Sequence, residues 1–210
     1  MQAANFSGVS ARDIHVWRGD RHVLRGLSIE VPAGTVVHVA GANGSGKTTL
    51  LRVLAGLLTP EEGGVSWHGQ PINANFDAYA AMLAYLGHSD ALKADFSARE
   101  NLAHEVGLRR AVTMAELDDV MARVGLAGCR DLPARVLSAG QRRRLAMSRV
   151  MLTAAPFWIL DEPFANLDHV GVLLLSGVIA EHVDGGGAVI IATHQPPAIP
   201  RHAARCVELT

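Results

Sequence analysis

Eight consecutive residues have the types and spacing that bind phosphate. They fit the pattern Gly-x-x-x-x-Gly-Lys-[Ser/Thr] at every position. The glycines allow a tight turn that points successive backbone N–H groups inward, and the helix expected next directs its positive dipole end at the same point. We therefore predict a cradle for a polyphosphate, made by Gly41, Ala42, Asn43, Gly44, Ser45, Gly46, Lys47 and Thr48, with Thr49 beside it.

Two side chains of this loop have defined chemistry. Lys47 is a mobile cation that can reach the outer phosphates, and the hydroxyl of Thr48 can supply one oxygen to Mg²⁺, which prefers oxygen ligands. The alternative is a glycine-rich turn with no ligand. The loop alone indicates nucleotide binding without indicating the work that is done.

Asp161 and Glu162 follow the apolar run 157–160, where a buried strand is expected to end. Asp161 can hold Mg²⁺ directly or through water, and Glu162 can orient or deprotonate the water that attacks a γ-phosphate. The alternative is an acidic pair that caps the next turn. Together with the phosphate loop, the pair favours catalysis.

The elements that must position these residues alternate between strands and helices. Short β segments are expected around 11–16, 23–30, 35–40 and 65–67, and buried strands at 82–86, 157–160 and 188–193. Helices are expected after Thr48, from about Ser138 to Ala154, and over 168–183. The alternation predicts an α/β core.

Between the strand at 82–86 and the one at 157–160 the pattern becomes helical. Capping boxes are expected at 97–100 and 113–116, where Ser or Thr precedes Glu by three residues. We predict a single domain over 1–210, with a helical subdomain inserted at about 89–154.

Composition limits the class of partner. The 210 residues include 19 basic and 20 acidic ones, so no overall field favours nucleic acid or anionic lipid. Cys129 and Cys206 match neither a disulfide framework nor a zinc site, which indicates a reducing compartment. No secretory signal is expected, and the apolar run 170–180 is shorter than the roughly twenty residues that span a bilayer.

The segment Leu137-Ser-Ala-Gly-Gln141 resembles the signature motif of ABC ATPases, with Ala139 in place of the usual glycine. The resemblance extends over nearly the whole chain and implies a P-loop NTPase fold with an N-terminal antiparallel β subdomain. It also implies that Ser138, Gly140 and Gln141 contact ATP held by the opposite subunit of a homodimer. The alternative is that Ser138 is an N-cap and that Arg142, Arg143 and Arg144 begin a basic solvated helix face, which we expect to hold in part.

Further positions carry over from the family. Residues 165–168 resemble the D-loop, and His194 resembles the switch histidine that donates a hydrogen bond to the γ-phosphate. Trp17 lies where the family often has a tyrosine stacked on adenine, although a core tryptophan is the alternative.

His88 departs from the family, which has glutamine at this position. Its imidazole can accept a hydrogen bond from the attacking or Mg²⁺-bound water but lacks the donor and acceptor pair of an amide. We expect a pH-sensitive link between nucleotide state and the helical subdomain; the alternative is a spacer histidine.

Four segments, at 85–88, 137–141, 158–164 and 193–196, resemble one subgroup, the ATP-binding subunits of the bacterial cytochrome c maturation (haem exporter) system. This implies an ATPase on the cytoplasmic face of the inner membrane, bound to integral membrane subunits and serving haem delivery to a periplasmic haem chaperone, or release of the loaded chaperone. No haem ligand is expected in the chain. The alternatives are the ATPase subunit of another small ABC transporter and, more remotely, a soluble ABC-type regulator.

Overall fold

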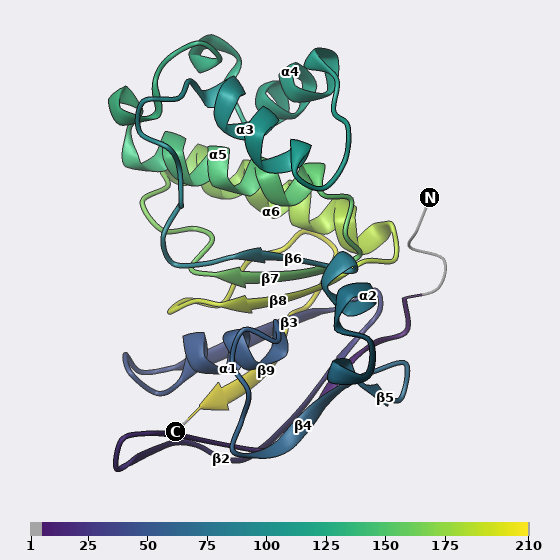
Figure 1. Ribbon diagram of the computed structural model, residues 1–210. Coiled ribbons are helices and arrows are strands. Elements are labelled where there is room, and N and C mark those ends of the chain that lie inside the picture. Colours follow the sequence, from purple (N-terminus) through teal and green to yellow (C-terminus); the bar gives the residue numbers. More distant parts are fainter. Residues whose placement is uncertain (1–5, 210) are drawn as a thin grey trace.

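The computed structural model describes residues 6–209, which form two β-sheets and helices stacked in layers (Figure 1). In chain order the strands and helices are β1 (Gly8–Arg18), β2 (Arg21–Pro32), β3 (Val36–Gly41), α1 (Lys47–Leu54), β4 (Glu62–Trp67), β5 (Gln70–Pro71), α2 (Phe76–Ala81), β6 (Leu83–Leu86), α3 (Ala98–Gly107), α4 (Met114–Arg123), α5 (Ala139–Leu152), β7 (Phe157–Asp161), α6 (His169–Asp184), β8 (Ala188–Ala192) and β9 (Arg205–Leu209). Short 3₁₀ turns occupy Ile72–Asn75, Ala127–Cys129 and Ala134–Val136.

The N-terminal strands form an antiparallel sheet in the order β2-β1-β4-β5. β1 and β2 make a long hairpin whose register runs from Gly8↔Pro32 to Arg18↔Arg21. The register shifts between Ala11 and Ile14, where Asp13 has a positive φ of 51°, and this bulge keeps Ala11 and Ile14 both buried.

The second sheet is parallel, in the order β6-β7-β8-β3-β9. Every residue of β7 is buried: Phe157 and Ile159 pack on one side of the sheet, and Trp158 and Leu160 on the other. A continuous apolar run is therefore explained by a central strand covered on both faces.

Helices α3, α4, α5 and α6 cover one face of the parallel sheet, and α1 with the antiparallel sheet covers the other (Figure 1). Helices α3, α4 and α5 all lie between β6 and β7 along the chain. The capping boxes predicted at Ser97 and Thr113 are both formed, with Glu100 and Glu116 as the reciprocal partners.

The predicted α/β class is thereby confirmed, with its antiparallel sheet and its helical insertion. Three elements were not predicted: α2 has only six residues, β5 has only two, and β9 is an edge strand whose side chains are mostly exposed. None of the three has the periodicity that marks a longer element. None of the helices in residues 6–209 combines the length and the apolar character needed to cross a membrane.

Candidate functional site

A cleft of about 400 Å³ opens where four parallel strands end. β3 leads into the phosphate loop, β6 into His88, β7 into Glu162 and β8 into His194, so the strand order brings these segments together. The cleft is lined by Arg18, Arg21, Val23, Asn43, Gly44, Gly46, Lys47, Thr48, Thr49, His88, Asp161, Glu162 and His194.

The phosphate loop turns as its glycines predict. Gly46 has φ 107° and lies directly before α1, and a Cβ added there would come 2.9 Å from Leu24 Cδ2. The ammonium of Lys47 is folded into the loop, where Nζ donates to the carbonyls of Gly41 at 2.7 Å and Ala42 at 3.0 Å. Ser45 Oγ is buried and has no hydrogen-bond partner within residues 6–209. A phosphate would offer acceptors to both side chains, so the loop fits this ligand.

Thr48 and Asp161 meet across the floor of the cleft. The hydroxyl of Thr48 donates to Asp161 Oδ2 at 2.8 Å, and Asp161 is 2% exposed. The two oxygens belong to elements 113 positions apart in sequence. A hydroxyl and a carboxylate whose oxygens lie 2.8 Å apart are a fitting pair of protein ligands for Mg²⁺. The ion prefers oxygen ligands and keeps water and phosphate in its remaining positions.

Glu162 and His194 form the other side of the cleft. His194 Nε2 lies 3.3 Å from Glu162 Oε1, with the imidazole 52% exposed and the carboxylate side chain 18% exposed. Glu162 has φ 51°, which is rare for a residue with a side chain, and its N–H donates to the Ala192 carbonyl at 2.8 Å. The carboxylate therefore faces the cleft on a backbone that its surroundings must hold in place.

The backbone before His194 is supported by a residue that the sequence did not single out. His38 on β3 is 3% exposed, and its Nε2 lies 3.0 Å from the Thr193 carbonyl, to which it donates. His38 thus satisfies a carbonyl that lies just beyond the end of β8.

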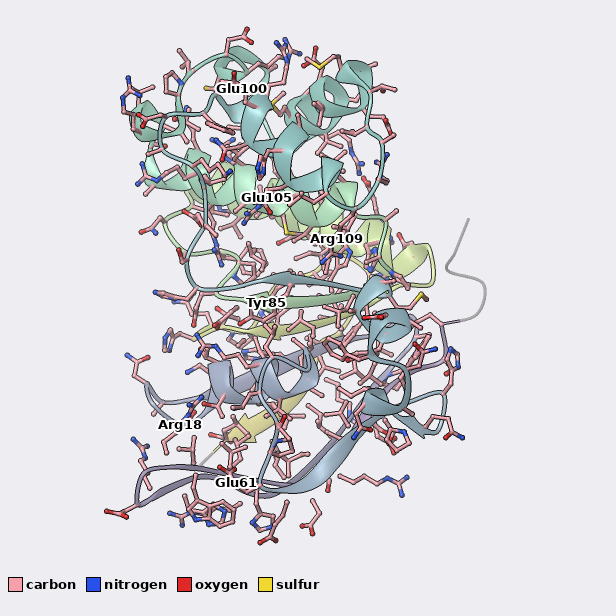
Figure 2. All side chains as sticks on the ribbon, viewed as in Figure 1. Arg18, Glu61, Tyr85, Glu100, Glu105 and Arg109 are labelled. Carbon is pink, nitrogen blue, oxygen red and sulfur yellow. The ribbon has the colours of Figure 1, made fainter. Side chains whose placement is uncertain are left out.

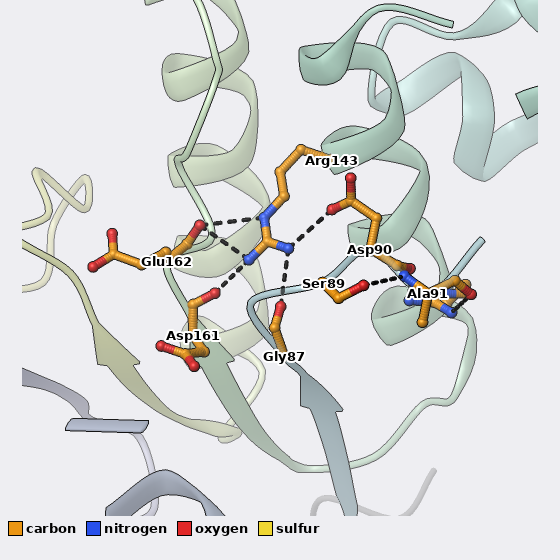
Figure 3. A network of polar contacts seen from close by, with 8 residues as sticks. Gly87, Ser89, Asp90, Ala91, Arg143, Asp161 and Glu162 are labelled. Carbon is orange, nitrogen blue, oxygen red and sulfur yellow. Dashed lines mark hydrogen bonds and ion pairs between the residues drawn. The ribbon is translucent and has the colours of Figure 1, made fainter. Parts of the chain in front are cut away.

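Arg143 corrects the prediction of a solvated basic face. Its side chain is 2% exposed and its guanidinium lies directly behind Asp161 and Glu162, with Gly87 and Asp90 on its other side (Figure 3). A signal for this was present, because Arg143 precedes the buried residues Met147 and Val150 by four and seven positions, the spacing of one helix face.

The predicted signature residues cap α5 and do not line the cleft. Ser138 Oγ accepts from Gln141 N at 3.1 Å, and Gln141 Oε1 accepts from Ser138 N at 2.8 Å. Gly140 lies so close to Asn166 that an added Cβ would come 2.7 Å from the Asn166 carbonyl oxygen. Within one chain these residues contact the segment after Glu162 and contribute nothing to the cleft.

Trp17 is also not among the residues that line the cleft, although its neighbours Arg18 and Arg21 are. The indole stacks on His22, with ring centroids 3.9 Å apart and an interplanar angle of 9°. Arg21 donates to the Gly44 carbonyl at 2.7 Å. The hairpin thus places two guanidiniums at the phosphate loop that the sequence did not reveal as site residues.

A groove of about 610 Å³ adjoins the cleft, and His88 lines both. It lies between the parallel sheet and helices α3 and α5, and Figure 2 shows Tyr85, Glu105 and Arg109 along it. Burial raises the pKa of the Tyr85 phenol, and the negative charge of Asp161 raises it further. The groove has an apolar floor that includes Val106, with charged side chains around it.

The comparisons agree with this geometry. The family model described as ABC transporter matches residues 24–165, which hold the phosphate loop and Asp161 with Glu162. The chain is 45% identical over 185 residues to the cytochrome c biogenesis ATP-binding export protein CcmA of Methylococcus capsulatus, covering 88% of this chain and 89% of that protein. The protein of the same name from Nitrosococcus oceani is 45% identical over 195 residues, covering 92% and 88%.

Solved structures share the fold. A bacterial Atm1-family ABC exporter with ATP bound matches with a TM-score of 0.86 and 25% identity, over 98% of this chain and 37% of that chain. The ATP binding subunit of an ABC transporter matches with a TM-score of 0.84 and 23% identity, over 96% of this chain and 85% of that one.

Proposed function

The chain belongs to the ABC transporter family, and we propose that it is the ATP-hydrolysing subunit of a transporter that serves cytochrome c biogenesis. The observation that carries the ATPase assignment is the meeting of Lys47, Thr48, Asp161, Glu162 and His194 around one cleft of about 400 Å³. The link to cytochrome c biogenesis is supported by the names of relatives that are 45% identical over most of their length.

ATP binding is assigned to the phosphate loop. Lys47 would exchange its two carbonyl acceptors for β- and γ-phosphate oxygens, and the free hydroxyl of Ser45 would donate to the same anion. Thr48 and Asp161 would hold Mg²⁺, which supplies positive charge to the phosphate oxygens when bound. Arg18 and Arg21 add positive charge at the mouth of the cleft.

Hydrolysis is assigned to Glu162 and His194. Glu162 accepts a proton from water as the water oxygen forms a bond to the γ-phosphorus, and the bond from that phosphorus to the bridging oxygen of ADP breaks. His194 donates a hydrogen bond to the γ-phosphate, and Lys47 balances its charge. The contact of 3.3 Å between Glu162 and His194 supports their action on one phosphate.

Two copies of the chain are proposed to close head to tail on two ATP molecules. Ser138, Gly140 and Gln141 lie at the N-terminus of α5 and outside their own cleft, which leaves them available to the ATP of a partner copy. The free N–H groups and the dipole at a helix start attract phosphate.

Integral membrane subunits of a cytochrome c maturation system are the proposed partners, which would hold this chain on the cytoplasmic face of the bacterial inner membrane. The groove of about 610 Å³ beside His88 is a suitable docking site, because an apolar floor with charges around it fits an amphipathic segment. Haem and a periplasmic haem chaperone would be served indirectly, and no contact with nucleic acid is proposed.

His88 lines both the cleft and this groove, so it can couple nucleotide binding in the cleft to partner binding in the groove. We expect the rate of ATP hydrolysis to depend on its protonation. A His88→Gln variant with an unchanged rate and pH profile would remove this part of the proposal.

The test is Mg²⁺-dependent ATP turnover by the purified chain, with and without coexpressed candidate membrane subunits. Turnover that rises with the cytochrome c maturation subunits and is lost in Glu162→Gln, while ATP binding is retained, supports the proposal. Copurification with the membrane subunits of a different transporter would favour the other small ABC transporters. ATP binding without turnover in any combination would refute the ATPase assignment.

A further inference from the structure

Arg143 joins the two sides of the nucleotide site through backbone groups (Figure 3). Its Nε and Nη2 donate to the Glu162 carbonyl at 3.2 and 3.0 Å, and Nη2 also donates to the Asp161 carbonyl. Its Nη1 donates to the Gly87 carbonyl and to Asp90 Oδ1, both at 3.0 Å. The five N–H donors of a guanidinium can all be used in this arrangement.

The surroundings of Arg143 shield its charge from water. Arg143 is 2% exposed and forms an ion pair with Asp90, which is 25% exposed. Removing a partner from a buried charge leaves that charge uncompensated, which is strongly destabilising. A buried arginine is therefore stable only where its N–H donors meet acceptors. A planar fork is needed to reach carbonyls on two separate segments, which the point charge of lysine does not provide.

The groups that Arg143 holds are those next to the reacting groups. The Glu162 carbonyl belongs to a residue with φ 51°, so holding this carbonyl restricts the backbone from which the Glu162 side chain extends into the cleft. Gly87 directly precedes His88, and the segment that follows is held a second time by Arg149, which donates to the carbonyls of Asp90 at 2.5 Å and Ala91 at 3.2 Å.

We infer that Arg143 is a positioning residue for ATP hydrolysis, which sets the direction of Glu162 and makes it depend on the position of segment 87–90. This inference rests on the proposed function, because Glu162 is the proposed proton acceptor. Arg143 is not among the residues that line the cleft. We expect its effect on the chemical step, since Arg143 contacts the main-chain carbonyl of Asp161, whereas Thr48 of the phosphate loop contacts the Asp161 side chain.

The test compares Arg143→Gln with Arg144→Gln in the complex with its membrane subunits. Arg144 is a matched control, because it lies next along α5 and donates to a carbonyl, that of Val124 at 2.9 Å, away from the cleft. We expect Arg143→Gln to lower kcat by about tenfold or more, while KM and the Kd for ATP stay within about threefold. Arg144→Gln should keep kcat within about twofold.

Asp90→Asn supplies a second, milder variant that keeps the acceptor position and removes the counter-charge. It should lower kcat by about threefold, and in the Arg143→Gln background it should have no further effect, since the two residues act as a unit. If Arg143→Gln does not fold, Asp90→Asn alone decides the question.

Three results would overturn the inference: kcat unchanged in Arg143→Gln, equal losses of kcat in Arg143→Gln and Arg144→Gln, or unchanged kcat in Asp90→Asn. These outcomes require a wild-type complex that hydrolyses ATP. A wild-type complex without turnover would instead refute the proposed function, so the two failures are distinguishable.

Discussion

Acid should destabilise this protein through protonation of His182, at pH values above those at which its carboxylates become protonated. The imidazole stacks on Trp158 with ring centroids 3.8 Å apart, and its Nε2 donates to the Pro156 carbonyl at 3.1 Å. Burial lowers the pKa of His182 from 6.5 to about 4, in spite of its hydrogen bonds to backbone groups. The folded protein therefore holds this side chain in its neutral form.

The sign and size follow from proton linkage. Between pH values of about 4 and 6.5 the unfolded chain binds a proton at His182 that the folded protein does not bind, so the free energy of unfolding falls as the pH falls. One pKa unit corresponds to about 1.4 kcal/mol, so acidification from about pH 7 to about pH 4.5 should cost roughly 2 kcal/mol at this one site.

The assay is urea unfolding near pH 7 and near pH 4.5, followed by circular dichroism, for the wild type and for His182→Gln. The wild type should lose roughly 2 kcal/mol more than the variant, or about 0.8 M in the urea midpoint. Glu100, Glu116 and Asp184, whose pKa values are lowered by hydrogen bonds, are common to both proteins, so their effects cancel. Equal losses in the two proteins would refute the reasoning.

Three further outcomes are expected. His38→Leu should lower kcat for ATP by about tenfold, because the Thr193 carbonyl loses its donor, whereas His38→Gln should retain most of the rate; equal rates in the two variants would contradict this. Gly140→Ala should lower the free energy of unfolding by about 1–3 kcal/mol, since its Cβ would press on the Asn166 carbonyl, and an unchanged urea midpoint would count against that clash. Ser97→Ala should cost about 1 kcal/mol by the same assay, because it removes the capping box of α3; no measurable loss would mean that tertiary packing alone holds this helix end.

Features encoded by short segments were predictable. The caps at Ser97, Thr113 and Ser138 depend on hydrogen bonds between residues three positions apart. In the phosphate loop, Lys47 donates to carbonyls five and six positions before it, so these patterns too can be recognised without knowledge of the rest of the chain. The apolar run of β7 was predictable for a related reason, because a strand covered on both faces has no polar alternation.

Arg143 shows where this reasoning fails. Arginine is almost never fully buried unless it is paired, so three consecutive arginines indicate a surface. Arg143, the middle one, can be buried because the carbonyls of two separate segments accept its hydrogen bonds. These acceptors are main-chain groups of Gly87 and Glu162, so no side-chain pattern in the sequence indicates them. The surroundings of Trp17 also depend on pairing between strands, since its stack on His22 follows from the register of the β1–β2 hairpin.

The sequence by itself determined the local chemistry: the loop that can hold phosphate, the carboxylates at a strand end, the helix caps and the alternation of an α/β chain. Only the tertiary structure decided which of these meet. The order β6-β7-β8-β3-β9 places Lys47 of one segment beside Glu162 and His194 of others, and it leaves Ser138 outside the cleft. Pairing between strands more than a hundred residues apart depends on how buried faces fit together, which no short segment of sequence specifies.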